Sequence, residues 1–166
     1  IECAVVPTAV LSTHTQFKGW TFHDLTDEMD PIADHWKQEG FSFDAIYTGY
    51  LGSFRQVDIV KRYLRDFGDG ARIIVDPAMA DNGKLYPAFN EHYAAKNADL
   101  CAIADIADPN ITEAAYLTGL SYRECYTEEY VKELLLALAE IGTKTPILTG
   151  VSLGEGKTGA MGYDSK

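Results

Sequence analysis

The stretch that decides the fold is Ile73-Ile74-Val75-Asp76-Pro77-Ala78-Met79-Ala80-Asp81-Asn82-Gly83-Lys84-Leu85-Tyr86. It begins as an apolar, β-branched run, stops at an Asp-Pro pair, and continues to a second aspartate in Asp-Asn-Gly. A buried strand that ends in polar residues and a glycine turn is typical of open α/β sheets, which bind ligands at the carboxyl ends of their strands. Two carboxylates at such an edge could hold a divalent cation beside a phosphate group.

Composition limits the classes of function that the chain can serve. The chain has 166 residues, of which 46% are hydrophobic and 23% charged, and this indicates one globular domain with a real core. A formal net charge of -11 argues against nucleic acid as a partner, because backbone binding needs clustered basic residues. Cys3, Cys101 and Cys125 are scattered, which favours reduced thiols in a cytoplasmic protein over a zinc site or a disulfide framework. No apolar run is long enough for a membrane span.

Strand-like and helix-like segments alternate along the whole chain. We expect strands over residues 4–11, 43–48, 72–75, 99–104 and 146–149, and an antiparallel strand after the turn at 154–159. We expect helices over residues 21–29 and 30–39, from the cap Ser53 to Gly68, over 87–97, from Pro109 to about Gly119, and from the cap Thr127 to Gly142. This alternation predicts an α/β domain with a mostly parallel sheet and helices on both faces. The chain starts inside a strand-like run without Met, so residues 1–166 are expected to form a single partial domain.

The carboxyl ends of the predicted strands bring polar residues to one edge, namely Asp76, Asp81, Asn110, Glu113 and Thr149. Hard oxygen ligands of this kind suit Mg²⁺, which shares its coordination with water and phosphate. A purely local interpretation also fits, because Asp-Pro and Asp-Asn-Gly are common turns and Asn110 could cap a helix that has Glu113 in its first turn. His14 could be a surface residue, and packing is the ordinary role for Tyr50 and Tyr86.

Four segments, in order along the chain, resemble the pyridoxal/pyridoxamine kinases of the ribokinase-like superfamily. The segment from Asp76 to Tyr86 resembles the family signature Asp-Pro-Val-Met-Gly-Asp-Asn-Gly-Lys-Leu-Tyr. The other three are Val6-Pro7-Thr8 with Ser12-Thr13-His14-Thr15, then Phe43 to Gly52, and Pro109-Asn110-Ile111-Thr112-Glu113-Ala114. The resemblance implies a three-layer α/β/α fold and nearly the whole chain takes part in it. It departs from the family at Ala78 and Ala80, and at Asp108 before Pro109, where a threonine near the nucleotide is common.

The resemblance implies a role for each matching residue. Asp76 and Asp81 would lie near the phosphates of ATP, and Thr149 would touch the phosphate tail. Asn110 and Glu113 would organise Mg²⁺ largely through water, so that Asp76 and Glu113 are the metal candidates, and a monovalent cation is a further candidate. The ring pocket of the vitamin would be lined by Ser12, His14, Thr15 and Tyr50.

The implied activity is ATP-dependent phosphorylation of the 5′-hydroxymethyl group of a B6 vitamer. The alternatives are a hydroxymethylpyrimidine kinase of thiamine synthesis, or a non-catalytic paralogue that binds vitamer or nucleotide. No residue matches the catalytic base of the family, which is expected beyond Lys166, so the 166-residue chain alone is expected to be inactive. The resemblance also implies a homodimer.

Overall fold

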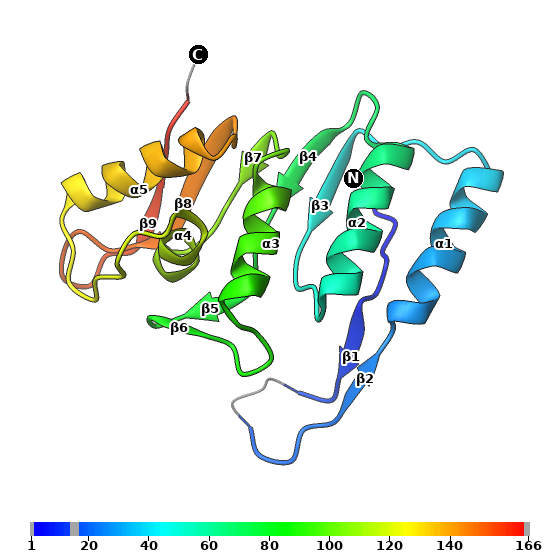
Figure 1. The fold of residues 1–166 in the computed structure, drawn as a ribbon, viewed down its shortest axis with the longest axis horizontal. Helices are drawn as coiled ribbons and strands as arrows, with labels where there is room; N and C mark the ends of the chain where they lie inside the picture. The colour runs from blue at the N-terminus through cyan, green and yellow to red at the C-terminus, as the bar shows by residue number, and fades with distance from the viewer. Residues whose placement is uncertain (1, 14–16, 165–166) are drawn as a thin grey trace.

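The computed structural model describes residues 2–13 and 17–164, and its centre is a five-stranded sheet. The strands are β3 (Ala45–Thr48), β4 (Arg72–Val75), β7 (Ile106–Ala107), β8 (Thr145–Val151) and β9 (Gly159–Gly162), in the spatial order β3-β4-β7-β8-β9. The first four are parallel, and β9 runs antiparallel to β8 (Figure 1). The expected α/β class, the mostly parallel sheet and the final antiparallel strand are therefore confirmed.

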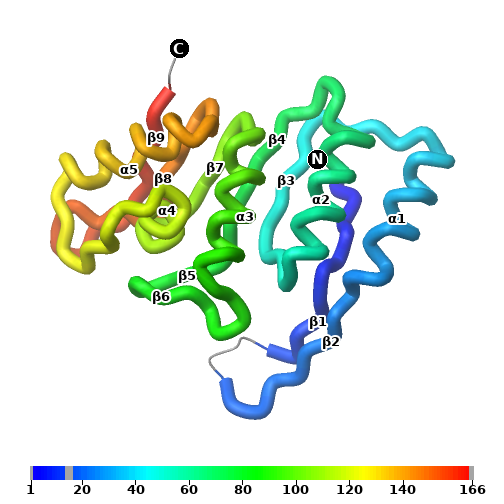
Figure 2. Tube along the Cα trace, in the orientation of Figure 1, coloured from blue at the N-terminus to red at the C-terminus, as the bar shows by residue number. Residues whose placement is uncertain are grey.

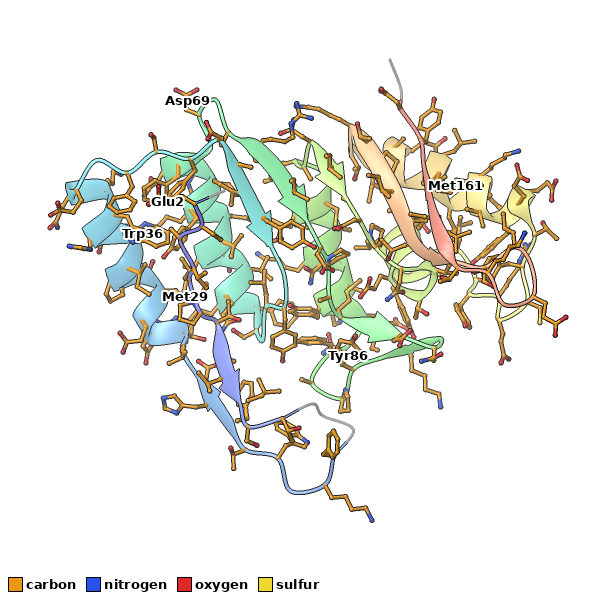
Figure 3. The ribbon with its side chains drawn as sticks, turned by 180° about the vertical axis from the view of Figure 1, so that it is seen from behind. Glu2, Met29, Trp36, Asp69, Tyr86 and Met161 are labelled. Atoms are coloured by element: carbon orange, nitrogen blue, oxygen red, sulfur yellow. The ribbon has the colours of Figure 1, made fainter. Side chains whose placement is uncertain are left out.

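Helices connect the parallel strands and lie against one face of the sheet. They are α1 (Thr26–Gln38), α2 (Phe54–Phe67), α3 (Glu91–Cys101), α4 (Ile111–Thr118) and α5 (Glu128–Glu140). In Figure 3, which views the molecule from behind, the strands lie in front of the helices. On the helix side Val75 and Leu148 are fully buried, whereas Tyr47 on the opposite face is 59% exposed. Helices on both faces were expected, but in the described part of the chain they form one covering layer.

Two small hairpins lie at one end of the sheet. One joins β1 (Ala9–Leu11) to β2 (Phe22–Asp24), and the other joins β5 (Ala80–Asp81) to β6 (Lys84–Leu85). Figure 2 shows both at the same end of the molecule. Figure 3 labels Tyr86, which follows β6, at this end and Asp69, which precedes β4, at the other. The carboxyl ends of the parallel strands therefore face the two hairpins.

The best-predicted element is α2, because its start, its buried stripe and its end are all local signals. The Ser53 side chain accepts a hydrogen bond from Gln56 N at 3.2 Å, which satisfies one of the free N–H groups of the first turn. The helix ends at Gly68 as predicted. Its buried stripe contains the four residues expected on one face, Val57, Val60, Tyr63 and Leu64.

The strand expected over residues 99–104 is wrong. That run is instead the end of α3 and the turn after it, and the strand begins only at Ile106. Helical spacing explains the difference, because Asn97, Leu100 and Cys101 are buried together with Tyr93 and Ala94 on one side of α3. The helix also starts later than expected, at the cap Asn90, whose side chain accepts a hydrogen bond from Tyr93 N at 3.0 Å.

The N-terminal segment also differs from expectation. The strand expected over residues 4–11 is restricted to β1, which pairs with β2 outside the central sheet, and β2 occupies part of the predicted helix 21–29. Helix α1 begins at Thr26 rather than beside Pro31, and Asp24 Oδ1 accepts a hydrogen bond from Thr26 N at 2.8 Å. Pro31 lies inside this helix, and the burial of Met29 and Ala33 beside α2 offsets the backbone hydrogen bond that proline removes.

A membrane-spanning helix is not found among the described residues, since none of their helices combines the necessary length and apolar character.

Helix α5 provides a matched test of the core. Leu134 is fully buried, whereas Leu136, two positions along, is 49% exposed. We expect Leu134→Ala to lower the free energy of unfolding by about 2–5 kcal/mol, because the change leaves a cavity that the neighbours fill only in part. Leu136→Ala should change it by about 0.5 kcal/mol or less. Urea denaturation measures both, and equal losses would contradict the packing described for α5.

Candidate active site

Parallel pairing brings two carboxylates together at the carboxyl ends of β4 and β7. Val75 and Ala107 are register partners, and the residues that follow them are Asp76 and Asp108. Backbone hydrogen bonds continue the sheet at this point, since Asp108 N donates to Val75 O at 3.1 Å and Asp76 N donates to Thr48 O at 3.1 Å. The two aspartates therefore stand side by side at the edge of the sheet that faces the hairpins.

Tyr47 connects these two carboxylates. Its phenol oxygen lies 3.3 Å from Asp76 Oδ2 and 3.2 Å from Asp108 Oδ2. Burial raises the pKa of the Asp76 carboxyl above its ordinary range, and the neighbouring charge of Asp108 raises it further. Burial also raises the pKa of Asp108, and burial together with both carboxylates raises the pKa of the Tyr47 phenol, which therefore keeps its proton and donates.

The start of α4 holds the segment that follows β4. Asn110 and Glu113 form a reciprocal capping box, in which Asn110 Oδ1 accepts from Glu113 N at 2.9 Å and Glu113 Oε2 accepts from Asn110 N at 2.8 Å. Glu113 Oε1 also accepts from Met79 N at 3.0 Å and from Ala80 N at 3.4 Å, and Asn110 Nδ2 donates to Ala80 O at 2.8 Å. The local interpretation of these two residues as a helix cap is correct, and the cap reaches across to the signature segment.

Glu113 is 3% exposed, and burial raises the pKa of its carboxyl to about 7. Backbone N–H groups donate hydrogen bonds to this carboxylate. They favour its charged form and therefore oppose the rise in pKa. Both carboxylate oxygens already accept hydrogen bonds from backbone groups. A cation bound directly by Glu113 would have to share oxygens that hold the chain in place.

Asn82 and Gly83 form the two-residue turn of the β5–β6 hairpin, directly after Asp81, the last residue of β5. Asn82 and Gly83 both have positive φ, 51° and 76°, as a tight hairpin turn of this type requires. The exposed Asp81 carboxylate accepts from Asn82 N at 2.8 Å and from Asn82 Nδ2 at 2.9 Å. Thr112 Oγ1 accepts from Gly83 N at 3.1 Å, which fastens the turn to α4. Asp81 thus stands at the tip of a hairpin rather than at the carboxylate pair.

Thr149 lies beside Asn110. The two form an isolated parallel bridge, and Thr149 N donates to Pro109 O at 2.9 Å. Thr149 is inside β8 rather than at its end, because β8 continues to Val151. Of the five residues that the sequence predicted at this edge, Asn110, Glu113 and Thr149 lie at the start of α4 and Asp76 lies at the end of β4, whereas Asp81 lies at the hairpin tip. The roles predicted for these residues stay predictions.

Of the four residues predicted to line the ring pocket, the structure describes two, Tyr50 and Ser12. Tyr50 follows β3, is half-buried, and packs its ring 5.8 Å from that of Phe89. Burial raises the pKa of its phenol. Ser12 is exposed in the turn after β1, where its Oγ accepts from Thr21 N at 2.8 Å. His14 and Thr15 lie outside the described residues, so their predicted role stays a prediction.

Three residues of this region were missed by reasoning from the sequence: Tyr47, Asp108 and Gln56. Asp108 was noted only as a departure from the family pattern, although it directly follows a strand, as Asp76 does. Gln56 is fully buried on α2, where its side chain accepts from Gly52 N at 2.6 Å and donates to Thr8 O at 2.9 Å and Thr26 Oγ1 at 2.8 Å. Gln56 therefore links the loop that carries Tyr50 to the N-terminal segment. Its position could have been noticed from the sequence, because it is a polar residue within the apolar stripe of a helix.

The edge is suited to a cation that brings most of its own ligands. Among residues 2–13 and 17–164 no three His, Cys, Asp or Glu side chains are placed to hold a metal together. Mg²⁺ in nucleotide enzymes needs only one or two carboxylates, with water and phosphate oxygens supplying the rest. Asp108 Oδ1 is buried and has no hydrogen-bond partner among the described residues, and an unpaired carboxylate oxygen of this kind fits a cation.

The raised pKa of Glu113 predicts a pH-dependent contribution to stability. Its pKa is 4.5 in the unfolded chain and about 7 in the folded protein, so the folded state holds this proton more tightly. The contribution is therefore fully present below pH 4.5 and is lost as the pH rises through about 7. We expect the wild type to exceed Glu113→Gln in free energy of unfolding by a larger amount at about pH 5 than at about pH 8. Urea denaturation at both pH values measures this difference, and a constant difference would contradict the assigned pKa.

Solved structures of known proteins resemble this chain in fold and sequence. A candidate phosphomethylpyrimidine kinase from Bacteroides thetaiotaomicron is 43% identical and has a TM-score of 0.89, over 95% of this chain and 55% of its own. Another crystal form of that protein, solved with pyridoxal, is 44% identical with a TM-score of 0.83, over 90% of this chain and 53% of its own. Pyridoxal kinase from Lactobacillus plantarum is 31% identical with a TM-score of 0.84, over 98% of this chain and 58% of its own.

A curated relative comes from thiamine synthesis. The chloroplastic thiamine biosynthetic bifunctional enzyme TH1 of Arabidopsis thaliana is 30% identical over 155 residues, which are 92% of this chain and 28% of that protein. The chain thus spans little more than half the length of the similar structures and less than a third of this relative. The profile of the family described as phosphomethylpyrimidine kinase matches residues 8–164. The chain therefore belongs to the phosphomethylpyrimidine kinase family, which includes the pyridoxal kinase-like proteins of ribokinase-like fold.

Proposed function

We propose that the protein to which this chain belongs transfers the γ-phosphoryl group of ATP to the 5′-hydroxymethyl group of a B6 vitamer. The observation that carries this proposal is the 44% identity to a structure solved with pyridoxal, combined with the acidic edge that faces the two hairpins. Phosphoryl transfer requires positioning and charge neutralisation more than covalent chemistry. The residues present here are suited to both of these tasks.

Each residue of the edge has a distinct task in this proposal. Asp76 faces the phosphates and would hold Mg²⁺, which supplies charge neutralisation when bound. Glu113 and Asn110 act through the backbone, because they fix the segment Met79–Ala80 that leads to the hairpin. Thr149, which lies beside Asn110, would contact the phosphate tail. Tyr50 would line the vitamer ring, as its half-buried aromatic face allows.

A second candidate function is phosphorylation of hydroxymethylpyrimidine in thiamine synthesis. The description of the family and the match to TH1 favour it. Both substrates are flat heteroaromatic rings that carry a hydroxymethyl group, so the acidic edge serves either one. The choice between them depends on the contacts made to the ring. Inactivity of the 166-residue chain by itself, the homodimer and the cytoplasmic location stay predictions.

Substrate preference distinguishes the two functions. We expect the protein at its full natural length to give a higher kcat/KM with pyridoxal or pyridoxamine than with hydroxymethylpyrimidine, in an assay coupled to ADP release. The reason is its similarity to a protein that binds pyridoxal. A higher kcat/KM with hydroxymethylpyrimidine would overturn the B6 assignment and favour the second function. No turnover with any of these substrates would favour a non-catalytic paralogue.

Asp76 provides a test of the phosphate side of the site. In the full-length protein we expect Asp76→Ala to raise the KM for Mg-ATP by about tenfold or more, since it removes a charge that would face the cation. The KM for the vitamer should change much less. Asp99→Ala is the control, because Asp99 is an exposed acid of α3 that pairs with Lys61. Unchanged Mg-ATP kinetics in Asp76→Ala would contradict the role assigned to this residue.

A further inference from the structure

The acidic edge contains two carboxylates that share one proton donor. The phenol of Tyr47 has a single hydrogen, yet its oxygen lies within hydrogen-bond distance of both Asp76 and Asp108. At any moment the hydrogen can point at only one of them. The backbone N–H of Ala78 also interacts with the Asp76 carboxylate, but the phenol itself can satisfy only one of the two carboxylates at a time.

Neither of these carboxylates is neutralised by a basic side chain. Within the described part of the chain no ion pair includes Asp76 or Asp108. Asp105, which precedes the same strand β7, shows the contrast, because its Oδ1 lies 2.7 Å from Lys144 Nζ and its Oδ2 accepts from Ile73 N at 2.8 Å. The acid at the start of β7 is thus fully paired, and the acid at its end is not.

Asp108 Oδ1 is the second unsatisfied feature. The atom is buried and has no hydrogen-bond partner among the described residues, whereas Oδ2 of the same carboxylate faces Tyr47. A buried oxygen of a charged group that lacks a partner costs free energy, and a bound cation removes that cost. The Glu113 carboxylate, in contrast, has no unpaired oxygen, since both of its oxygens accept hydrogen bonds from backbone N–H groups.

We propose that Asp108, rather than Glu113, is the second carboxylate that holds the divalent cation with Asp76, and that Tyr47 is the positioning residue for this pair. The inference rests on the proposed function only for the presence of the cation that accompanies the nucleotide. Two carboxylates leave room for water and phosphate oxygens on Mg²⁺. The family resemblance predicts a different pair, Asp76 with Glu113. A threonine, which is common in the family at the position of Asp108, carries no charge.

Direct titration of Mn²⁺, followed by electron paramagnetic resonance with a non-hydrolysable ATP analogue bound, tests this assignment in the full-length protein. Mn²⁺ takes the same oxygen ligands as Mg²⁺ and is visible to the method. We expect Asp108→Asn to raise the Mn²⁺ dissociation constant by about tenfold or more, because one full charge beside the ion is removed. Asp99→Asn, which makes the same change of charge on an exposed part of α3, should leave the constant unchanged.

The role of Tyr47 is tested by a double-mutant cycle. Tyr47→Phe keeps the ring and removes the hydroxyl, and we expect it to weaken Mn²⁺ binding by about three- to tenfold without lowering the melting temperature. In the Asp108→Asn background the same change should have a much smaller effect, since the pair to be positioned no longer exists. Additive losses would show that Tyr47 acts on folding or packing alone and would overturn its positioning role.

The results separate this inference from the proposed function. An unchanged Mn²⁺ constant in Asp108→Asn, with normal turnover by the wild type, would overturn the assignment of Asp108 alone. A greater loss of Mn²⁺ binding in Glu113→Gln than in Asp108→Asn, at an unchanged melting temperature, would also overturn it. A clear loss in Asp108→Asn, with no turnover of any vitamer or pyrimidine by the wild type, would support the cation pair and overturn the proposed kinase.

Discussion

The rest of the site depends on the hydrogen bonds that the buried carboxylate of Glu113 accepts. Burying a charged group is costly, and the cost is reduced here by backbone N–H groups from two different parts of the chain, Asn110 on one side and Met79 with Ala80 on the other. One side chain therefore joins the start of α4 to the segment after β4. This carboxylate holds Met79 and Ala80 of the segment from Asp76 to Tyr86, and hydrogen bonds from Asn110 Nδ2 to Ala80 O and from Gly83 N to Thr112 Oγ1 hold the same segment to α4.

The parallel sheet then determines where the remaining charges lie. Register pairing of Val75 with Ala107 forces the next residues, Asp76 and Asp108, to stand side by side. Burial raises the pKa of Asp76 and the neighbouring charge of Asp108 raises it further, so the folded protein carries an unfavourable interaction at this edge of the sheet. Unfavourable local electrostatics of this kind concentrate at functional sites, where a ligand relieves them. Glu113 differs from this pair, because both of its oxygens accept hydrogen bonds from backbone N–H groups and it links two parts of the backbone.

Local signals made much of the fold predictable, and long-range contacts account for what was missed. Strand β4 and helix α2 were predicted closely because a β-branched run, a serine cap and a terminal glycine are local. The run at residues 99–104 was taken for a strand because its apolar pattern is too short to show helical periodicity, and its burial depends on packing of α3. The start of α1 was misplaced because the hydrogen bond from Thr26 N to Asp24 Oδ1 and the burial of Met29 compensate for a proline inside the helix.

The same distinction explains which parts of the site could be read from the sequence. Asp76, Asn110 and Glu113 were identified because they fall at strand ends and helix starts, which periodicity and family resemblance both indicate. The hydrogen-bond partners of the site carboxylates could not be predicted from the sequence, because the partners lie far away in the chain. Tyr47, for example, is 29 positions from Asp76 and 61 positions from Asp108. Glu113 and Asp108 carry the same formal charge, yet one has every oxygen satisfied and the other has a buried oxygen without a partner. Charge alone makes both of them candidate metal ligands, and hydrogen-bond satisfaction separates the carboxylate that holds the backbone from the one for which we propose a cation.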